Sequence, residues 1–316
     1  MRMNNGRFLT THLKSRLNAI QFRKTHNLKW FTKKKKRTMN LIFDFDGTIT
    51  VNDTIFQLAQ GAISFKQQQQ DLQPAWDAIV KAYGDDHKAF AKTYSPPESE
   101  RLSPEQELAY LSSLKDTENA SLNRVDQSGL FSGLTSQNLF QMGKSQVSSG
   151  AVAIRQGFVE MIELARQKGW HVGVLSVNWS EAFIQGVLHP IDVPIITNQI
   201  SADGTIQGPD GFNDGVRLTT SRCKANSLEQ LILKVGHSSR PTVYFGDSTT
   251  DMECLLAHYG IVISADAKSS LMQTLDRVGV PVPHVDSSQD GANVVWARDF
   301  REILQNQTLE RISTGQ

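Results

Sequence analysis

The sequence predicts an α/β protein with a three-layer, doubly wound parallel sheet of Rossmann-like type and a helical cap inserted after the first strand. Short apolar runs alternate with helical patterns from residue 40 onward, and fully apolar strands are typical of a parallel sheet covered on both faces. Polar residues stand at the ends of these runs, where open α/β sheets place their sites. A long segment without a strand pattern follows the first run, and this insertion favours a cap.

The predicted elements follow from spacing. Apolar β-type runs predict strands at 41–43, 172–175, 243–245 and 261–263, and apolar residues at helical spacing predict helices over 158–168, 224–235 and 251–258. An Asp-Gly pair between β-formers predicts a hairpin over 200–206. We therefore expect a catalytic α/β core over 39–50 and 156–310, a helical cap over 51–155 and a separate arm over 1–38.

The inserted segment has a polar, helical pattern. Trp76, Ile79, Val80 and Tyr83 recur on one helix face, and a stretch rich in Ser, Asn and Gly follows. Two interpretations of this segment remain open: a cap over the site and a peripheral helical decoration. Insertion directly after the first strand favours the cap.

Composition indicates a soluble globular protein, with 39% hydrophobic and 21% charged residues among 316. No apolar run reaches the roughly 18–20 residues that cross a bilayer, so we expect no membrane span. Cys223 and Cys254 are the only cysteines. Their number and spacing fit neither a disulfide scaffold nor a zinc site and favour a reducing compartment.

The N-terminal arm carries a strong charge asymmetry. Twelve of the 33 Lys and Arg residues lie in 1–39, which contains no Asp or Glu. The other 21 face all 32 acidic residues, so the remainder has a net charge of −11. Leucine and isoleucine recur at helical spacing inside the arm, a pattern typical of a mitochondrial transit peptide, which predicts import into mitochondria by the import machinery.

Three alternatives remain open for the arm. The run 33–37 is compatible with a nuclear localisation signal or a nucleic-acid patch, although no folded reading element accompanies it and no nucleic-acid partner is expected. Met39 directly precedes the first strand and is a possible true start, which leaves a cytoplasmic protein. In each case we expect the arm to be disordered in the mature fold.

Two acidic pairs are the strongest chemical signals. Asp44 and Asp46 follow the first strand and precede Gly47, so one carboxylate can bond to a reacting centre while the other moves protons. Asp247 ends a later strand and Asp251 begins a helix. Mg²⁺ takes one or two carboxylates together with substrate phosphate, so these groups predict a magnesium site. Taken alone, the pair Asp44 and Asp46 is also compatible with a surface turn. Asp251 alone is also compatible with a charge at a helix N-terminus.

Two further residues complete a phosphate site. Ser176 offers a hydroxyl at a strand end, and Lys224 opens the predicted helix over 224–235. A hydroxyl and an ammonium group are what the outer oxygens of a phosphoryl group require. Arg222 is a nearby alternative to Lys224, and alone each residue carries little weight.

These motifs, in this order, resemble the haloacid dehalogenase superfamily of phosphohydrolases over residues 40–305. The segment 44–48 resembles the first motif, Ser176 the second, Lys224 the third, and the stretch from Gly246 to Asp251 the fourth. The cap and the hairpin resemble the phosphoserine-phosphatase-like subgroup. Segments 174–180 and 243–263 and the cap segment with Trp76 and Tyr83 are similar to plant thiamine-monophosphate phosphatase domains, and the full length is similar to an uncharacterised fungal family.

The resemblance implies a role for each residue. Asp44 is the nucleophile that forms an aspartyl-phosphate, and Asp46 protonates the leaving oxygen and then activates water. Ser176 and Lys224 hold phosphoryl oxygens. Mg²⁺ is bound by Asp44, the Asp46 backbone carbonyl and Asp247, with Asp251 as a ligand or as an anchor for Lys224.

The sequence therefore predicts a Mg²⁺-dependent phosphatase of a small-molecule phosphomonoester, such as a thiamine-monophosphate-like or phosphoserine-like compound. A phosphotransferase or phosphomutase and a non-catalytic binding protein with a basic arm are the rival functions. The second carboxylate, Asp46, favours a water acceptor over transfer.

Overall fold

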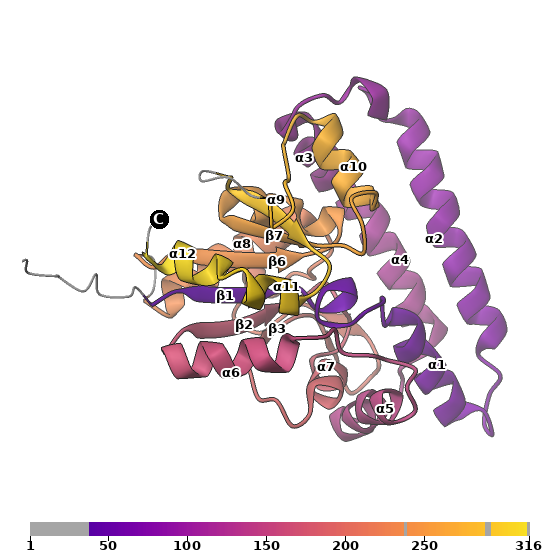
Figure 1. The fold of residues 1–316 in the computed structure, drawn as a ribbon. Coiled ribbons are helices and arrows are strands. Elements are labelled where there is room, and N and C mark those ends of the chain that lie inside the picture. Colours follow the sequence, from indigo (N-terminus) through magenta and orange to yellow (C-terminus); the bar gives the residue numbers. More distant parts are fainter. Residues whose placement is uncertain (1–37, 237–238, 288–291, 315–316) are drawn as a thin grey trace, which may run out of the picture. The chain divides into compact units, whose positions relative to one another are not determined.

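A six-stranded parallel sheet forms the centre of the computed structural model, which describes residues 38–236, 239–287 and 292–314 (Figure 1). The strands are β1 (Asn40–Phe43), β2 (His171–Leu175), β3 (Ile195–Ile196), β6 (Thr242–Gly246), β7 (Tyr259–Ile263) and β8 (Val294–Ala297). Apart from Thr38, the predicted arm over 1–38 lies outside the described residues. The predicted fold class is confirmed.

The two edge strands, β3 and β8, were not predicted. β3 has only two residues, which is too short for a pattern. β8 is a run of four apolar residues in which Trp296 is partly exposed. The strand order β3-β2-β1-β6-β7-β8 places β1 at the point where the order reverses. Ligands bind at such a switch point, outside the carboxyl ends of the strands.

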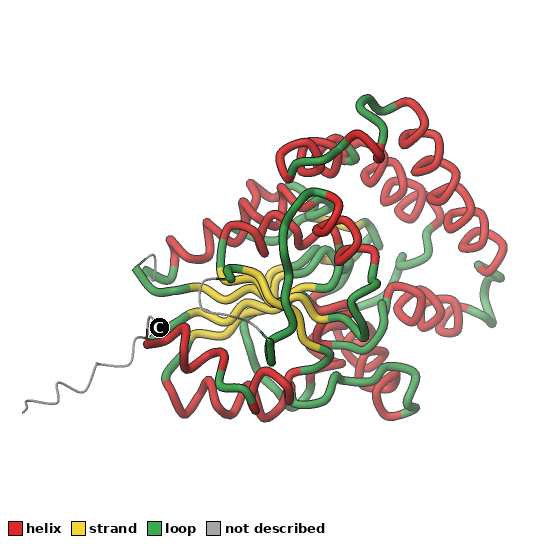
Figure 2. The backbone as a smooth tube through the Cα atoms, turned by 45° about the horizontal axis from the view of Figure 1, so that its top comes forward, coloured by secondary structure: helices red, strands yellow, loops and turns green. Residues whose placement is uncertain are grey.

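Helices cover both faces of the sheet, as Figure 2 shows. On one face the rings of Phe43 and Phe245 stack 4.4 Å apart and pack with Phe158 of α6 and Phe300 of α11. Ile42 belongs to a second cluster, on the face covered by α8 and α9. Neighbouring residues of β1 thus point to opposite faces, and both faces are buried.

The helices of the core lie between and after its strands. They are α6 (Phe158–Lys168), α7 (Glu181–Leu188), α8 (Ser221–Lys234), α9 (Met252–Ala257), α10 (Ser270–Arg277), α11 (Phe300–Gln305) and α12 (Thr308–Thr314). The predicted start of α8 at Lys224 was wrong. The helix begins at Ser221, because the Thr220 side chain accepts a hydrogen bond from the Cys223 amide and caps it.

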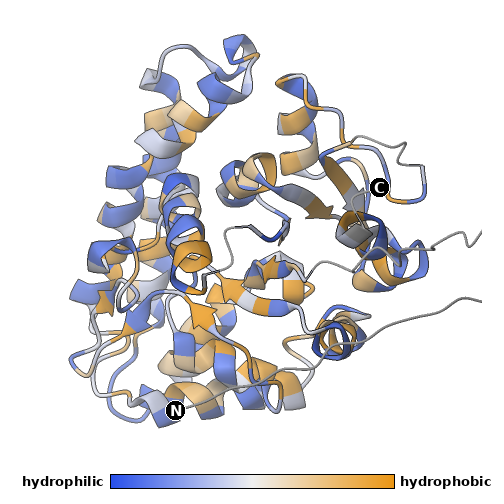
Figure 3. Ribbon diagram, turned by 90° about the vertical axis from the view of Figure 1, so that its left-hand side faces the viewer, coloured by the Kyte–Doolittle hydropathy of each residue, from blue (hydrophilic) through white to orange (hydrophobic). Residues whose placement is uncertain are grey.

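Five helices fill the insertion between β1 and α6. They are α1 (Ile55–Lys66), α2 (Gln73–Thr93), α3 (Pro104–Ser113), α4 (Lys115–Ser128) and α5 (Ser136–Ser148). Figure 1 shows α2 and α4 running side by side beyond one end of the sheet. The strands are strongly apolar, whereas the outer faces of the long helices are hydrophilic (Figure 3). None of the described helices combines the length and apolarity needed to cross a membrane.

Ion pairs and a hairpin join the inserted helices to the core. Arg277 of α10 lies 2.9 Å from Glu107 of α3, which is also paired with Arg101 at 2.7 Å. The predicted hairpin is present as β4 (Gln199–Ile200) and β5 (Ile206–Gln207), which pair antiparallel. The main-chain amide of Ile206 donates a hydrogen bond to Asp126 of α4. The inserted helices therefore sit over the carboxyl end of the sheet.

Candidate active site

The loop after β1 turns the chain sharply over the sheet edge. Asp44 is 4% exposed, and its amide donates a 2.8 Å hydrogen bond to the carbonyl of Phe245 in β6. Gly47 has φ +71°, and a Cβ atom there would overlap the carboxylate of Asp247. Glycine is therefore required twice, by the backbone conformation and by the close approach of the second loop.

Lys224 is the buried cation of the site. Its Nζ lies 2.7 Å from Asp44 Oδ1 and 2.5 Å from Asp251 Oδ1, and its side chain is fully buried. Burial alone lowers the pKa of Lys224, but the charges of Asp251 and Asp44 raise it above its ordinary value, so the ammonium stays charged. Arg222, the predicted alternative, is exposed and pairs with Glu253 at 2.6 Å. It lies outside the site.

Asp251 anchors both the lysine and the loop after β6. Its Oδ1 accepts hydrogen bonds from Lys224 and from the Tyr244 hydroxyl at 2.7 Å. Its Oδ2 accepts 3.1 Å hydrogen bonds from the amides of Asp247 and Ser248. Both oxygens are already engaged, so of the two predicted roles the geometry favours the anchor.

The donor set fits a divalent metal ion. Oxygens of Asp44, Asp247 and Asp251 lie within 4.8 Å of one another, and the three carboxylates face one ammonium group, which leaves two negative charges. Burial and the charge of Asp251 raise the pKa of Asp247 to about 7, and the same two causes raise that of Asp44. A divalent cation would balance this excess charge. Carboxylate oxygens are ligands that Mg²⁺ prefers.

Asp46 stands apart from this cluster. Its Oδ1 accepts hydrogen bonds from the Thr54 amide at 2.8 Å and the Thr54 hydroxyl at 2.6 Å, and its Oδ2 accepts one from Asn178 at 2.8 Å. The predicted metal ligand at this position is the backbone carbonyl of Asp46, so its carboxylate is not needed to bind the metal. Burial and the charge of Asp53 raise the pKa of Asp46 to about 6, so it can both donate and accept a proton near neutral pH.

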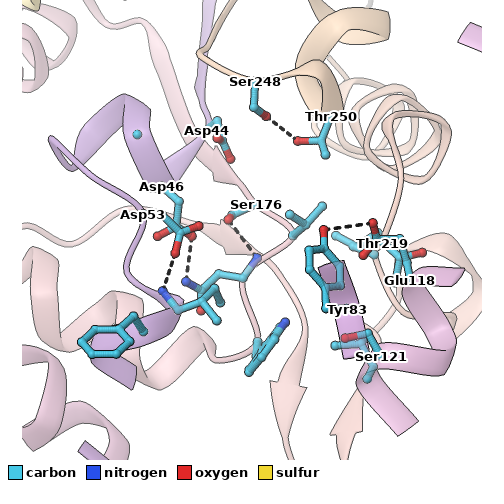
Figure 4. Close-up of a pocket in the computed structure, with 18 of the residues that line it drawn as sticks. Asp44, Asp46, Asp53, Tyr83, Glu118, Ser121, Ser176, Thr219, Ser248 and Thr250 are labelled. Atoms are coloured by element: carbon cyan, nitrogen blue, oxygen red, sulfur yellow. Dashed lines mark hydrogen bonds between the residues drawn. The ribbon is translucent and has the colours of Figure 1, made fainter. Parts of the chain in front are cut away.

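Ser176 directly follows β2 and is fully buried. Its hydroxyl oxygen accepts a 3.0 Å hydrogen bond from the amide of Asn178, whose side chain holds Asp46. The close-up in Figure 4 shows Ser176 between Asp46 and the residues of the inserted helices. One short loop after β2 therefore places a hydroxyl in the site and also orients the second carboxylate.

Several supporting residues escaped the sequence analysis. Arg155 donates hydrogen bonds to the carbonyl oxygens of Thr48 at 2.9 Å and Gly47 at 2.5 Å, and so fixes the loop after β1 from a position 107 residues away in sequence. Thr54, Asn178 and Tyr244, described above, are of the same kind. No local pattern marks them, because each acts through a contact with a distant segment.

The structure brings the predicted site residues together from four separate segments. Asp44, Asp46, Ser176 and Asp247 line one cavity of about 510 Å³, and Lys224 and Asp251 are bonded to its base. The opposite wall comes from α1, α2 and α4 and includes the predicted face with Trp76, Ile79, Val80 and Tyr83. The inserted helices thus form a cap over the site, not a peripheral decoration.

The fold and this site define a Rossmann-like α/β protein with two acidic pairs at the switch point of its sheet. The haloacid dehalogenase-like hydrolase family model matches residues 41–256, and the protein belongs to that family. The hydrolase class predicted from the sequence is thereby confirmed. A CTO1 family protein of Schizosaccharomyces pombe is 30% identical over 235 residues, covering 69% of this chain and 78% of that protein, which confirms the expected similarity to a fungal family.

The solved structures to which this chain is similar include two enzymes. A substrate-bound phosphoserine phosphatase complex matches with a TM-score of 0.49 and 17% identity, covering 86% of this chain and 99% of that chain. A cytosolic 5'-nucleotidase IIIB bound to cytidine matches with a TM-score of 0.48 and 15% identity, covering 88% of this chain and 85% of that chain.

Proposed function

We propose that the protein is a Mg²⁺-dependent phosphatase that hydrolyses a small-molecule phosphomonoester through an aspartyl-phosphate on Asp44. One observation carries the proposal. A buried carboxylate paired with a buried lysine, Asp44 with Lys224, belongs to a cluster of three carboxylates that could hold a metal ion, while a second carboxylate with a pKa of about 6, Asp46, is held separately. Nucleophile, anion binding and proton transfer therefore have separate side chains in one cavity.

The first half-reaction transfers the phosphoryl group to the protein. Asp44 attacks phosphorus, the bond from phosphorus to the leaving oxygen breaks, and Asp46 gives its proton to that oxygen. An ammonium group has three donors, and Lys224 uses two of them on Asp44 and Asp251. The third and the Ser176 hydroxyl bind phosphoryl oxygens. A Mg²⁺ ion held by Asp44, Asp247 and the Asp46 carbonyl would offset the repulsion between the carboxylate and the phosphate.

The second half-reaction returns the enzyme to its starting state. The Asp46 carboxylate, now ionised, accepts a proton from water, whose oxygen attacks phosphorus. The bond between phosphorus and Asp44 breaks, and inorganic phosphate leaves. A held base beside the acyl-phosphate favours water over an alcohol acceptor, which argues for hydrolysis over phosphotransferase or phosphomutase activity.

The test is release of inorganic phosphate by the purified full-length chain from thiamine monophosphate, phosphoserine and sugar phosphates. The first two represent the proposed substrate types. We expect turnover with Mg²⁺ and loss of turnover in excess chelator, restored when Mg²⁺ is added back. Equal rates with and without chelator would contradict the metal requirement. Absence of phosphate release from every ester would contradict the phosphatase itself.

For the arm over 1–38 we propose delivery to mitochondria through the import machinery, on the basis of its basic, acid-free, amphipathic composition. The full chain with a C-terminal fluorescent tag should co-localise with a mitochondrial marker, whereas a chain starting at Met39 should not. A diffuse or nuclear signal from the full chain would favour the cytoplasmic or nuclear alternative.

A further inference from the structure

The wall of the cavity opposite the catalytic carboxylates has a distinctive composition. Three aromatic residues of the inserted helices line it, Phe56, Trp76 and Tyr83, together with aliphatic side chains, and Trp179 of the loop after β2 joins them. The rings of Trp76 and Trp179 meet edge to face, 6.2 Å apart. Aromatic faces carry a negative electrostatic potential, which attracts cations as well as apolar groups.

Two carboxylates accompany these rings. Glu118 of α4 lies across the cavity from Asp46 and accepts a 3.3 Å hydrogen bond from Tyr83 through Oε1, the same oxygen that lies 2.9 Å from His87 (Figure 4). Asp53 uses its Oδ1 to accept a hydrogen bond from the Ile55 amide. Within the described part of the chain, Glu118 Oε2 and Asp53 Oδ2 form no hydrogen bond or ion pair.

Basic side chains are missing from the same wall. Among the described residues that line the cavity there is no Lys, Arg or His, and Lys224 is committed to Asp44 and Asp251 at its base. His87, which lies 2.9 Å from Glu118 Oε1, does not line the cavity. A leaving group with its own carboxylate or phosphate would therefore face Asp53, beside Asp46, and the free Oε2 of Glu118 with no basic side chain in the cavity. A positively charged leaving group would meet two carboxylates and several aromatic faces.

We propose that the leaving group of the substrate is a cation with an apolar or aromatic body, such as a quaternary ammonium or an N-alkylated heteroaromatic alcohol. This inference rests on the proposed function, because it assigns the alcohol half of the same phosphomonoester. The catalytic end binds the phosphate, and the aromatic and acidic wall binds the cation. Selection between substrates then depends on charge at the end remote from phosphorus.

The test compares two esters of the same shape. 2-(N-Methylpyridinium-4-yl)ethyl phosphate and 2-(4-methylphenyl)ethyl phosphate differ by one positive charge on the ring. We expect the full-length enzyme to show a kcat/KM about tenfold higher for the cationic ester, the size of one desolvated cation–π contact. Equal values, or a preference for the neutral ester, would overturn the inference.

Two variants of the same helix separate a local effect from a general one. Glu118→Gln keeps the shape and removes the charge, and we expect it to reduce the preference for the cationic ester several-fold. Asp116→Asn removes an exposed carboxylate of α4 that does not line the cavity, so it should leave the preference unchanged. If both variants lost the preference for the cationic ester equally, the preference would come from the overall electrostatic field of the protein. That result would contradict a cation-binding wall in the cavity.

A binding measurement distinguishes failure of this inference from failure of the proposed function. Trp76 and Trp179 line the cavity, so intrinsic fluorescence reports its occupation. Benzyltrimethylammonium should quench it at lower concentration than benzenesulfonate at equal ionic strength, and Glu118→Gln should weaken that quenching. If this holds while no ester is hydrolysed, the cation subsite stands and the phosphatase fails. If esters are hydrolysed but the anion binds as well as the cation, the phosphatase stands and the subsite fails.

Discussion

The two walls of the cavity differ in how much of their structure is complete without a substrate. On the core side Asp44 is 4% exposed, and the fully buried Lys224 pairs with both Asp44 and Asp251. On the cap side Phe56 is 57% exposed and Val80 50% exposed. Under the proposed function, the core wall is preorganised for one reaction at phosphorus. The cap wall leaves apolar side chains exposed, and a bound molecule would cover them.

The largest expected effect tests the core wall. Asp44→Asn preserves shape but removes the nucleophile, so we expect phosphate release to fall by about 10⁴-fold or more. Circular dichroism should show an intact fold, because Lys224 keeps Asp251 as a partner. Glu118→Gln, on the cap side, is the comparison and should cost far less. Comparable losses from both substitutions would erase the distinction between the two walls.

Gly47→Ala tests how closely the two core loops approach each other. The added Cβ would overlap the Asp247 carboxylate and displace it, so we expect kcat to fall about 10²-fold, as a misplacement of about 1 Å does elsewhere. Gly133→Ala is a matched control, since Gly133 also has a positive φ of +76° but open space around a Cβ. Gly133→Ala should lose about 1 kcal/mol of unfolding free energy and no activity. Gly47→Ala should lose activity and more unfolding free energy than Gly133→Ala, because its Cβ also overlaps Asp247.

The same contrast explains how much the sequence could predict. The parallel sheet and its order of polar strand ends are local patterns, and the placement of Asp44, Ser176 and Asp247 follows because parallel strands end at one edge. The predicted start of α8 was three residues too late. Thr220 caps the helix and sets its start, and no pattern of apolar residues marks that position. Arg155 acts on carbonyl groups of a distant loop, and no residue type or spacing encodes such a contact.

The cap was predictable as helices but not as a binding surface. One face of α2 was visible from the spacing of Trp76 and Tyr83. Which residues of α1 and α4 join that face depends on how three helices pack, and a helical period alone does not encode it. Glu118 looked like any exposed acid of a polar helix, because its position in the cavity wall arises only in the packed structure.

A smaller effect concerns the proton-transfer group of the core wall. Asn178→Ala removes a donor that stabilises ionised Asp46, so the pKa of Asp46 should rise above about 6. Because the second half-reaction needs the ionised carboxylate, the acidic limb of the kcat–pH profile should move to higher pH. This shift can be checked by measuring kcat from roughly pH 4.5 to 8.5, a range that brackets the acidic limb. Asp46→Asn should abolish the limb, and an unmoved limb in Asn178→Ala would assign it to another group.

The smallest expected effect belongs to the cap wall. Phe56→Ala removes a ring that lines the cavity and is 57% exposed, so the ring contributes to binding and little to folding. We expect kcat/KM for the best ester to fall about fivefold, corresponding to loss of one aromatic contact, with the acidic limb unchanged. Phe65→Ala is the matched control, because Phe65 is 52% exposed on the same helix and does not line the cavity. A shifted pH profile in Phe56→Ala would mean that the cap also sets the chemistry of the core, and the division between the two walls would not hold.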